Sequence, residues 1–142
     1  MIDPTVVDTN VLASGIARVN PTAPPAVIFD AWRDGAFTLV TSEHIIGELE
    51  RTLALTYFRR SLTSPQIEAD IAYIRSPARV VPLTATVHGV ATHVEDDMVL
   101  ATALSGGARY IVTGDQALLA LGSYGGVTIC TARRFLDELL GT

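Results

Sequence analysis

The sequence of 142 residues contains no lysine, so its ten basic side chains are all arginines. A P-loop places a lysine on the nucleotide phosphates and Schiff-base catalysis uses a reactive lysine, so both are excluded. The single cysteine, Cys130, excludes an internal disulfide framework and a cysteine-rich zinc site. No apolar run reaches the ~20 residues of a transmembrane span, and no signal peptide is visible at the N-terminus. We therefore expect a globular protein of the cytoplasm.

The charge balance is acidic, because 15 acidic side chains oppose ten arginines and give a net charge of -5. Such a chain is a poor electrostatic match for duplex DNA unless metal ions or local arginine clusters reverse the sign of the field. The length corresponds to one domain. We expect residues 1–142 to form that single domain.

Short β-branched runs alternate with helical patterns along the chain, without a linker or an internal repeat. This alternation predicts a parallel sheet with helices on both faces, which is a three-layer α/β/α sandwich. Helix starts are indicated by Pro25, by Ser42 as an N-cap, and by Ser64 as an N-cap before Pro65. The expected strands are residues 5–7, 37–40, 79–83, 110–112 and 127–130. The expected helices are residues 26–34, 42–53, 64–74, 87–93, 96–104, 116–121 and 131–140, with a further helix opening at 11–13.

Acidic residues follow two of the expected strands. Asp8 comes directly after the first strand, and Asp115 follows the fourth strand after two residues. Ligands bind such sheets at the carboxyl ends of the strands, so we expect these carboxylates to approach each other if the two strands are neighbours. Asp96 and Asp97 begin the helix that leads into the fourth strand, at the same edge. Glu48 lies beside the apolar stripe of its helix, where it can border a cleft.

Several carboxylates in one cleft raise one another's pKa and oppose folding, and a divalent cation removes that cost. Oxygen ligands without histidine or cysteine at ligand spacing suit Mg²⁺ or Mn²⁺, which can activate water for hydrolysis of a phosphodiester. Each acid also has a structural interpretation. Asp8 can cap a helix, Asp115 can be a turn residue, and Glu48 can be a solvated side chain. Asp96 and Asp97 can stabilise the helix dipole. The functional hypothesis depends on the joint placement of these acids.

Five segments resemble the PIN-domain family in order and spacing: VVDTNVLAS, SEHIIGELERTL, EDDMVLATAL, GGARYIVTGDQALLAL and VTICTARRFLDELL. They cover nearly the whole chain, and the likeness is greatest to the VapC-like toxin components of bacterial toxin–antitoxin pairs. The resemblance implies an α/β/α fold with a five-stranded parallel sheet and a ribonuclease activity that depends on Mg²⁺ or Mn²⁺. It also implies a homodimer and a small antitoxin partner that blocks the site.

Carried over motif by motif, the resemblance implies four catalytic acids: Asp8, Glu48, Asp96 and Asp115. Its implied metal ligands are three of them: Asp8, Asp96 and Asp115. Three further side chains match supporting polar positions: Asn10, Asp97 and Thr113. One departure is that relatives often have Asp-Pro shortly before the third acid, where this chain has His93-Val94. The choice between Asp96 and Asp97 as the main ligand therefore stays open.

Two other α/β families with strand-end aspartates are disfavoured by particular residues. A phosphatase of the haloacid dehalogenase type has a second aspartate two residues after the first, where this chain has Asn10. A receiver domain has two adjacent early acids, which are missing here, and both families use a lysine. We expect a metal-dependent endoribonuclease acting on single-stranded or looped RNA, with a metal-bound water as nucleophile. The alternative is a catalytically silent PIN-like module that binds RNA or protein.

Overall fold

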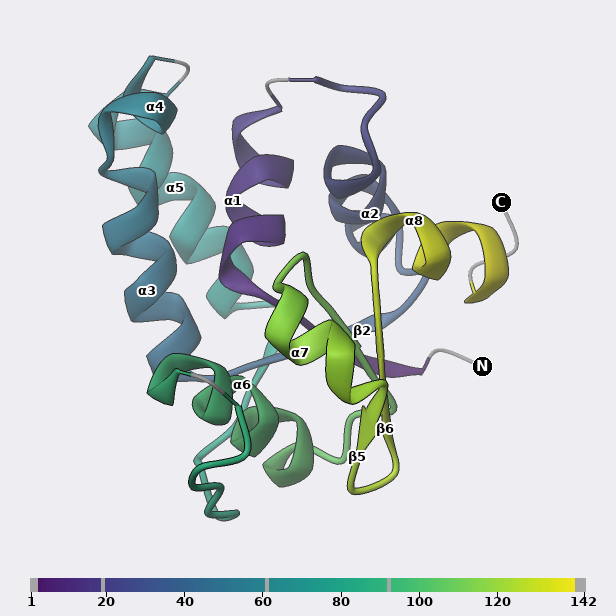
Figure 1. The fold of residues 1–142 in the computed structure, drawn as a ribbon. Coiled ribbons are helices and arrows are strands. Elements are labelled where there is room, and N and C mark those ends of the chain that lie inside the picture. The colour runs from purple at the N-terminus through teal and green to yellow at the C-terminus, as the bar shows by residue number, and fades with distance from the viewer. Residues whose placement is uncertain (1–2, 19, 61, 92, 140–142) are drawn as a thin grey trace.

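The structure is a computed structural model that describes residues 3–18, 20–60, 62–91 and 93–139. Its centre is a six-stranded sheet with the strand order β3-β2-β1-β4-β6-β5 (Figure 1). The strands are β1 (Pro4–Val7), β2 (Thr38–Thr41), β3 (Arg79–Val80), β4 (Tyr110–Val112), β5 (Ser123–Tyr124) and β6 (Val127–Cys130). All pair in parallel except β5, which is antiparallel to β6.

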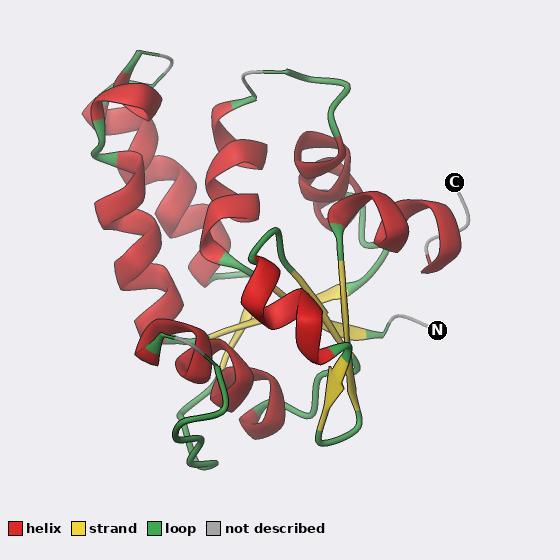
Figure 2. Cartoon of the chain, in the orientation of Figure 1, coloured by secondary structure: helices red, strands yellow, loops and turns green. Residues whose placement is uncertain are grey.

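Helices cover both faces of this sheet (Figure 2). One layer contains α1, α2, α3 and α5, which pack on one another, and α6 contacts β1, β2 and β4 from the other side. The predicted α/β/α architecture is confirmed. The helices are α1 (Thr9–Ala17), α2 (Pro24–Arg33), α3 (Glu43–Leu53), α4 (Thr56–Arg59), α5 (Ser64–Arg75), α6 (Val94–Ser105), α7 (Gln116–Leu121) and α8 (Ala132–Arg134), which continues as a π-helical turn, η1 (Phe135–Leu139).

The sheet differs from the prediction of five parallel strands at its edges. All five expected strands are present, but the sheet has a sixth, because β5 turns back onto β6 through Gly125 and Gly126. Both glycines have positive φ, 56° and 84°, which permits this tight turn. With two residues, β5 carries no alternating pattern that would mark it in the sequence. The third strand is also shorter than expected, since β3 ends at Val80.

Two local predictions about helices are wrong, and one helix was missed. Described residues between 87 and 93 form no helix, because Asp97 accepts hydrogen bonds from the N–H groups of Gly89 and Ala91 and holds an irregular loop. The N-cap of α5 is Thr63, whose side chain forms a capping box with Gln66, so the helix begins one residue earlier than a Ser64 cap implies. The short helix α4 was not expected.

Packing of α1 against α2 depends on a glycine. A Cβ added at Gly15 would lie 2.7 Å from the carbonyl oxygen of Pro25 and 3.1 Å from Cβ of Phe29. The two helices can therefore approach closely only because Gly15 has no side chain.

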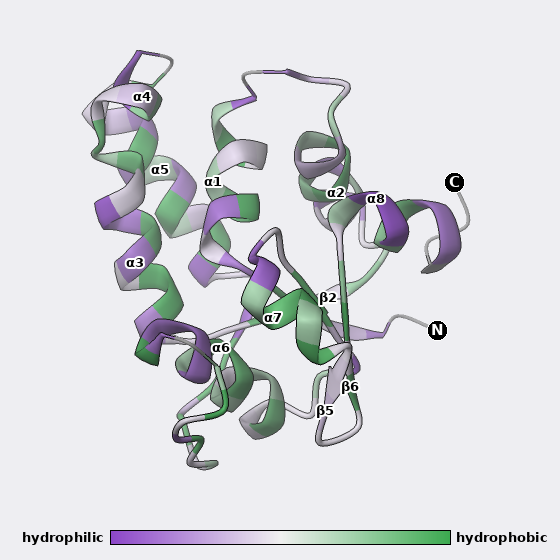
Figure 3. Cartoon of the chain, viewed as in Figure 1, coloured by the Kyte–Doolittle hydropathy of each residue, from purple (hydrophilic) through white to green (hydrophobic). Residues whose placement is uncertain are grey.

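The helix α3 carries one buried face and one polar face. Hydrophilic and hydrophobic residues alternate along it (Figure 3). Ile45, Ile46, Leu49 and Leu53 are all buried, as their helical spacing predicts. The described part of the chain contains no helix long and apolar enough to cross a membrane.

Candidate active site

Asp8 and Asp115 lie where the order of the parallel strands reverses. The chain places β2 and β3 on one side of β1, and β4 and β6 on the other. Val7 of β1 pairs with Val112 of β4, and the Asp8 N–H donates to the Val112 carbonyl oxygen at 2.9 Å. The segments that follow the two strands therefore meet at one carboxyl edge, which is where open α/β sheets bind their ligands.

Thr113 connects the two acids. It is 1% exposed, and its Oγ1 donates to Asp8 Oδ2 at 2.7 Å and accepts from the Asp115 N–H at 3.0 Å. Asp8 Oδ1 accepts from the Thr9 N–H, and Asp115 Oδ1 accepts from the Leu118 N–H. Both acids thus cap a helix: Asp8 caps α1, as its structural interpretation predicts, and Asp115 caps α7, where the structural interpretation was a turn residue. A capping role does not exclude the functional one, because both side chains also lie at the carboxyl edge.

The first turn of α6 brings Asp96 toward the same edge. Asp96 is 9% exposed, and its Oδ2 is buried without a hydrogen-bond partner among the described residues. Its pKa is raised to about 6, first by burial and then by the nearby charges of Asp115 and Asp8. His93 lowers this pKa, and Glu48 raises it further. An unpaired buried carboxylate oxygen is costly, so it needs an explanation at this position.

Glu48 reaches the cluster from α3. Burial raises its pKa, and the charges of Asp8 and Glu95 raise it further, whereas His44 lowers it. His44 Nε2 lies 3.0 Å from Glu48 Oε1, but the approach does not form a hydrogen bond. Glu48 therefore experiences the charge of Asp8, although 40 residues separate the two in the chain.

A buried hydrogen bond joins the start of α3, which carries Glu48, to α6, which carries Asp96. Ser42 Oγ and Thr102 Oγ1 are 2.9 Å apart, and both residues are buried. Since Thr102 Oγ1 already donates to the Met98 carbonyl oxygen, Ser42 acts as the donor between the two hydroxyls. The N-cap residue of α3 thus also positions the helix.

Asp8 is under the same electrostatic influence. Burial is the main reason that its pKa is raised, and the charge of Asp115 adds to the effect. Hydrogen bonds from Thr113 and Thr9 lower the pKa in part. The four acids that the family resemblance implies are catalytic therefore interact electrostatically, either directly or through a third acid. They come from four different elements of the fold.

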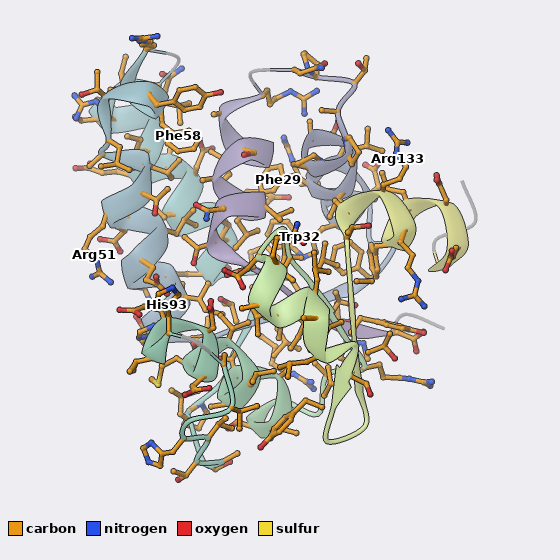
Figure 4. All side chains as sticks on the ribbon, viewed as in Figure 1. Phe29, Trp32, Arg51, Phe58, His93 and Arg133 are labelled. Carbon is orange, nitrogen blue, oxygen red and sulfur yellow. The ribbon has the colours of Figure 1, made fainter. Side chains whose placement is uncertain are left out.

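A cleft of about 630 Å³ opens beside Asp8 and Asp115. Asn10 is exposed and lines this cleft, as does His93, the N-cap residue of α6. Figure 4 shows His93 at the start of α6 near α3. In the sequence, the only indication of a role for His93 is that it lies close to the acids. The structure shows that His93 also lines the cleft.

Asp97 differs from its neighbour Asp96. Both of its carboxylate oxygens accept backbone N–H groups, Oδ2 from Gly89 at 3.0 Å and Oδ1 from Ala91 at 2.7 Å. The acceptor positions of Asp97 are thus used to hold the loop before α6. The carboxylate of Asp96 does not hold the described residues of this loop. The hydrogen bonds therefore distinguish the two adjacent acids, which their spacing in the sequence does not.

The donor chemistry of the cluster fits a divalent cation. The ligand atoms are all carboxylate oxygens, as Mg²⁺ and Mn²⁺ prefer, and the unpaired Asp96 Oδ2 is a buried acceptor in need of a positive partner. The described residues contain no group of three acids, histidines or cysteines already arranged to hold an ion. The like charges that raise the pKa of Asp96 are what a cation would neutralise.

Known structures share this fold at low sequence identity. VapBC2 from Rickettsia felis, solved bound to a DNA fragment from its promoter, is 13% identical with a TM-score of 0.59, over 89% of this chain and 96% of that chain. FitAcB from Neisseria gonorrhoeae is 18% identical with a TM-score of 0.57, over 91% and 98%. VapC20 from Mycobacterium tuberculosis, described as a toxin that cleaves the sarcin–ricin loop, is 21% identical with a TM-score of 0.59, over 87% and 98%.

At the level of sequence, no curated protein matches the chain. A family model does match, and it is described as the PIN domain and covers residues 4–117. These residues contain α1, α3, α6 and the beginning of α7, and with them all four acids. The chain therefore belongs to the PIN-domain family, whose members are nucleases that generally act with divalent metal ions.

Proposed function

We propose that this protein is a metal-dependent endoribonuclease that hydrolyses phosphodiester bonds in single-stranded or looped RNA. The observation that carries the proposal is the buried, unpaired Oδ2 of Asp96 beside Asp8 and Asp115 at the strand-order reversal. Asp8, Asp96 and Asp115 would hold Mg²⁺ or Mn²⁺, with Glu48 close by from α3. When bound, such an ion neutralises phosphate charge and supplies a reactive water at neutral pH.

The protein's own side chains prepare this site in defined ways. Thr113 keeps Asp8 and Asp115 at a fixed spacing by bonding to both. Asn10 lines the cleft without burial, where its amide can contact a phosphate or a water molecule. Asp97 supports the site indirectly, because it anchors the loop that leads to His93 and Asp96.

The choice of RNA as substrate follows the family and its structural relatives. VapC20, which shares this fold, is described as cleaving the sarcin–ricin loop. An acidic chain would repel RNA at its cleft unless a cation supplies positive charge there, so metal and substrate binding are expected to be linked.

We further propose that the protein is the toxin of a toxin–antitoxin pair and forms a homodimer. The relatives include VapBC2 and a VapC toxin, which supports a small antitoxin partner. Induction of the wild-type chain in bacteria should arrest growth, and Asp8→Asn should not. The mass of the purified protein in solution tests the dimer. Normal growth with active wild-type protein would contradict the toxin role and leave the nuclease intact.

A calorimetric titration with Mn²⁺ is the first test of the metal site. The wild type should bind one or two ions per chain, and Asp8→Asn should bind them much more weakly. Glu68→Gln on the exposed face of α5 is the matched control, since it removes one acid outside the cluster. Absence of binding by folded wild type would favour the catalytically silent module.

Cleavage of RNA is measured next, on structured and unstructured substrates with Mg²⁺ or Mn²⁺. The wild type and Glu68→Gln should cleave, and Asp8→Asn should fold but fail to cleave. Robust cleavage by Asp8→Asn would refute the assigned role of this acid.

A further inference from the structure

A second, smaller cavity adjoins the acidic cleft. It has a volume of about 230 Å³ and lies between the α1–α2 region and α4. Ser14 and Pro25 line both cavities, so the two are continuous along the surface. The lining residues of the second cavity are Ser14, Asn20, Ala23, Pro25, Ala26 and Tyr57.

Tyr57 presents an aromatic ring to this cavity. It is 56% exposed and takes part in no polar contact with the described residues. Its ring packs edge-on against buried Phe58, with centroids 4.9 Å apart and planes at 89°. Phe58 therefore supports the ring from one side while much of Tyr57 stays accessible.

Asn20 offers hydrogen-bond donors at the cavity that no other described residue uses. Asn20 Oδ1 accepts from both the N–H and the hydroxyl of Thr22, at 3.2 and 3.0 Å. This fixes the side-chain oxygen and leaves the Asn20 amide nitrogen with two hydrogens to donate. Arg59 and Arg60 are exposed at the end of α4 but do not line this cavity, since Arg59 borders a separate pocket together with Glu50 and Glu68.

We propose that this cavity binds a base of the RNA substrate, stacked on Tyr57, while a neighbouring phosphate lies in the acidic cleft. The inference rests on the proposed RNA substrate and extends it to a specificity-determining residue. An aromatic face suits any base, and the Asn20 amide can donate to acceptor atoms on the base edge. Continuity with the acidic cleft favours a nucleotide over an apolar protein side chain, because one RNA chain can then occupy both cavities.

The test measures binding separately from cleavage. In an Asp8→Asn background, which keeps RNA uncut, and with enough Mn²⁺ to fill the weakened metal site, labelled single-stranded oligoadenylate and oligouridylate are titrated by fluorescence anisotropy. Tyr57→Ala should weaken binding by about 5- to 150-fold, the range for loss of one base–aromatic stack, and Tyr57→Phe should bind like the parent. Leu55→Ala is the matched control, because Leu55 is 58% exposed beside α4 but lines neither cavity.

Two further measurements place the effect at the base. An abasic sugar–phosphate oligomer should bind the parent and Tyr57→Ala equally. In a Tyr57→Trp variant, oligoadenylate should quench the new exposed indole, whereas Trp32 is 6% exposed and supplies only a constant background. Unchanged RNA affinity in Tyr57→Ala, an equal loss on the abasic oligomer, or no oligomer binding by the parent would each overturn the inference. A stacking effect in a protein that never cleaves RNA would uphold it and refute the nuclease instead.

Discussion

Replacing Asp96 by asparagine should stabilise the metal-free protein at neutral pH. The Asp96 carboxylate is buried beside Asp115 and Asp8, and these surroundings raise its pKa from 3.8 to about 6. The folded state therefore binds a proton more tightly than the unfolded state does. Between these two pKa values the unfolding free energy falls as the pH rises, and it loses nothing further from this group above about pH 7.

The magnitude follows from the size of the pKa change. A rise from 3.8 to about 6 corresponds to roughly 3 kcal/mol of unfavourable interaction in the ionised state. The asparagine removes the charge but leaves an amide in place of the unpaired Oδ2, which offsets part of the gain. We expect Asp96→Asn to be about 1–3 kcal/mol more stable than the wild type at pH 7.5, or roughly 3–9 °C in Tm.

Thermal and urea unfolding from pH 4 to pH 8 with EDTA measures this effect. The wild type and Asp96→Asn should converge near pH 4 and diverge as the pH rises toward 7. Asp34→Asn, on an exposed acid outside the cluster, should follow the wild type throughout. Mn²⁺ at about 1,000 times its Kd should reverse the order, because it adds about 4.1 kcal/mol to the wild type alone. A metal-free Asp96→Asn that is less stable than the wild type, or parallel pH profiles, would refute the reasoning.

Two other substitutions test how the site is supported. Asp97→Ala removes the acceptor for the N–H groups of Gly89 and Ala91. It should lower the free energy of unfolding in urea by about 1.5–3 kcal/mol and speed amide hydrogen exchange at these two positions. Slow exchange there would contradict the anchoring role. Thr113→Val removes a bond that lowers the Asp8 pKa and an acceptor for a backbone N–H. It should raise the Asp8 pKa seen by carbon-detected NMR titration and destabilise the fold by about 1–3 kcal/mol; an unchanged Asp8 pKa would show that the hydroxyl has no electrostatic role.

Much of the fold could be predicted because its signals are local. The strands are marked by short runs of β-branched residues. The caps Asp8, Ser42 and Thr131 stand directly before the helices that they begin. Alternation of strands and helices then restricts the topology to a parallel sheet with crossovers of one hand. Elements without such signals were missed, as shown by the two-residue strand β5 and the one-turn helix α4.

The acids of the site could be predicted for a related reason. In a doubly wound sheet, a residue that directly follows a strand must lie at the carboxyl edge, so the sequence positions of Asp8 and Asp115 already imply their location. The same argument predicts the edge for the start of α6. It does not separate Asp96 from Asp97, because both belong to the same helical turn.

The tertiary structure shows how the contacts of the two acids differ, since these contacts are made with residues distant in the sequence or in irregular backbone. Asp97 accepts N–H groups of a loop that carries no periodic pattern, and Asp96 lies near the carboxylates of Asp8 and Asp115, which follow β1 and β4. The cavity at Tyr57 likewise arises from segments some 40 residues apart in the chain. The sequence by itself determined most of the longer elements and which acids follow strands at the sheet edge, because periodicity and capping are local. The burial, pairing and pKa of each side chain depend on packing between elements, which sequence spacing does not specify.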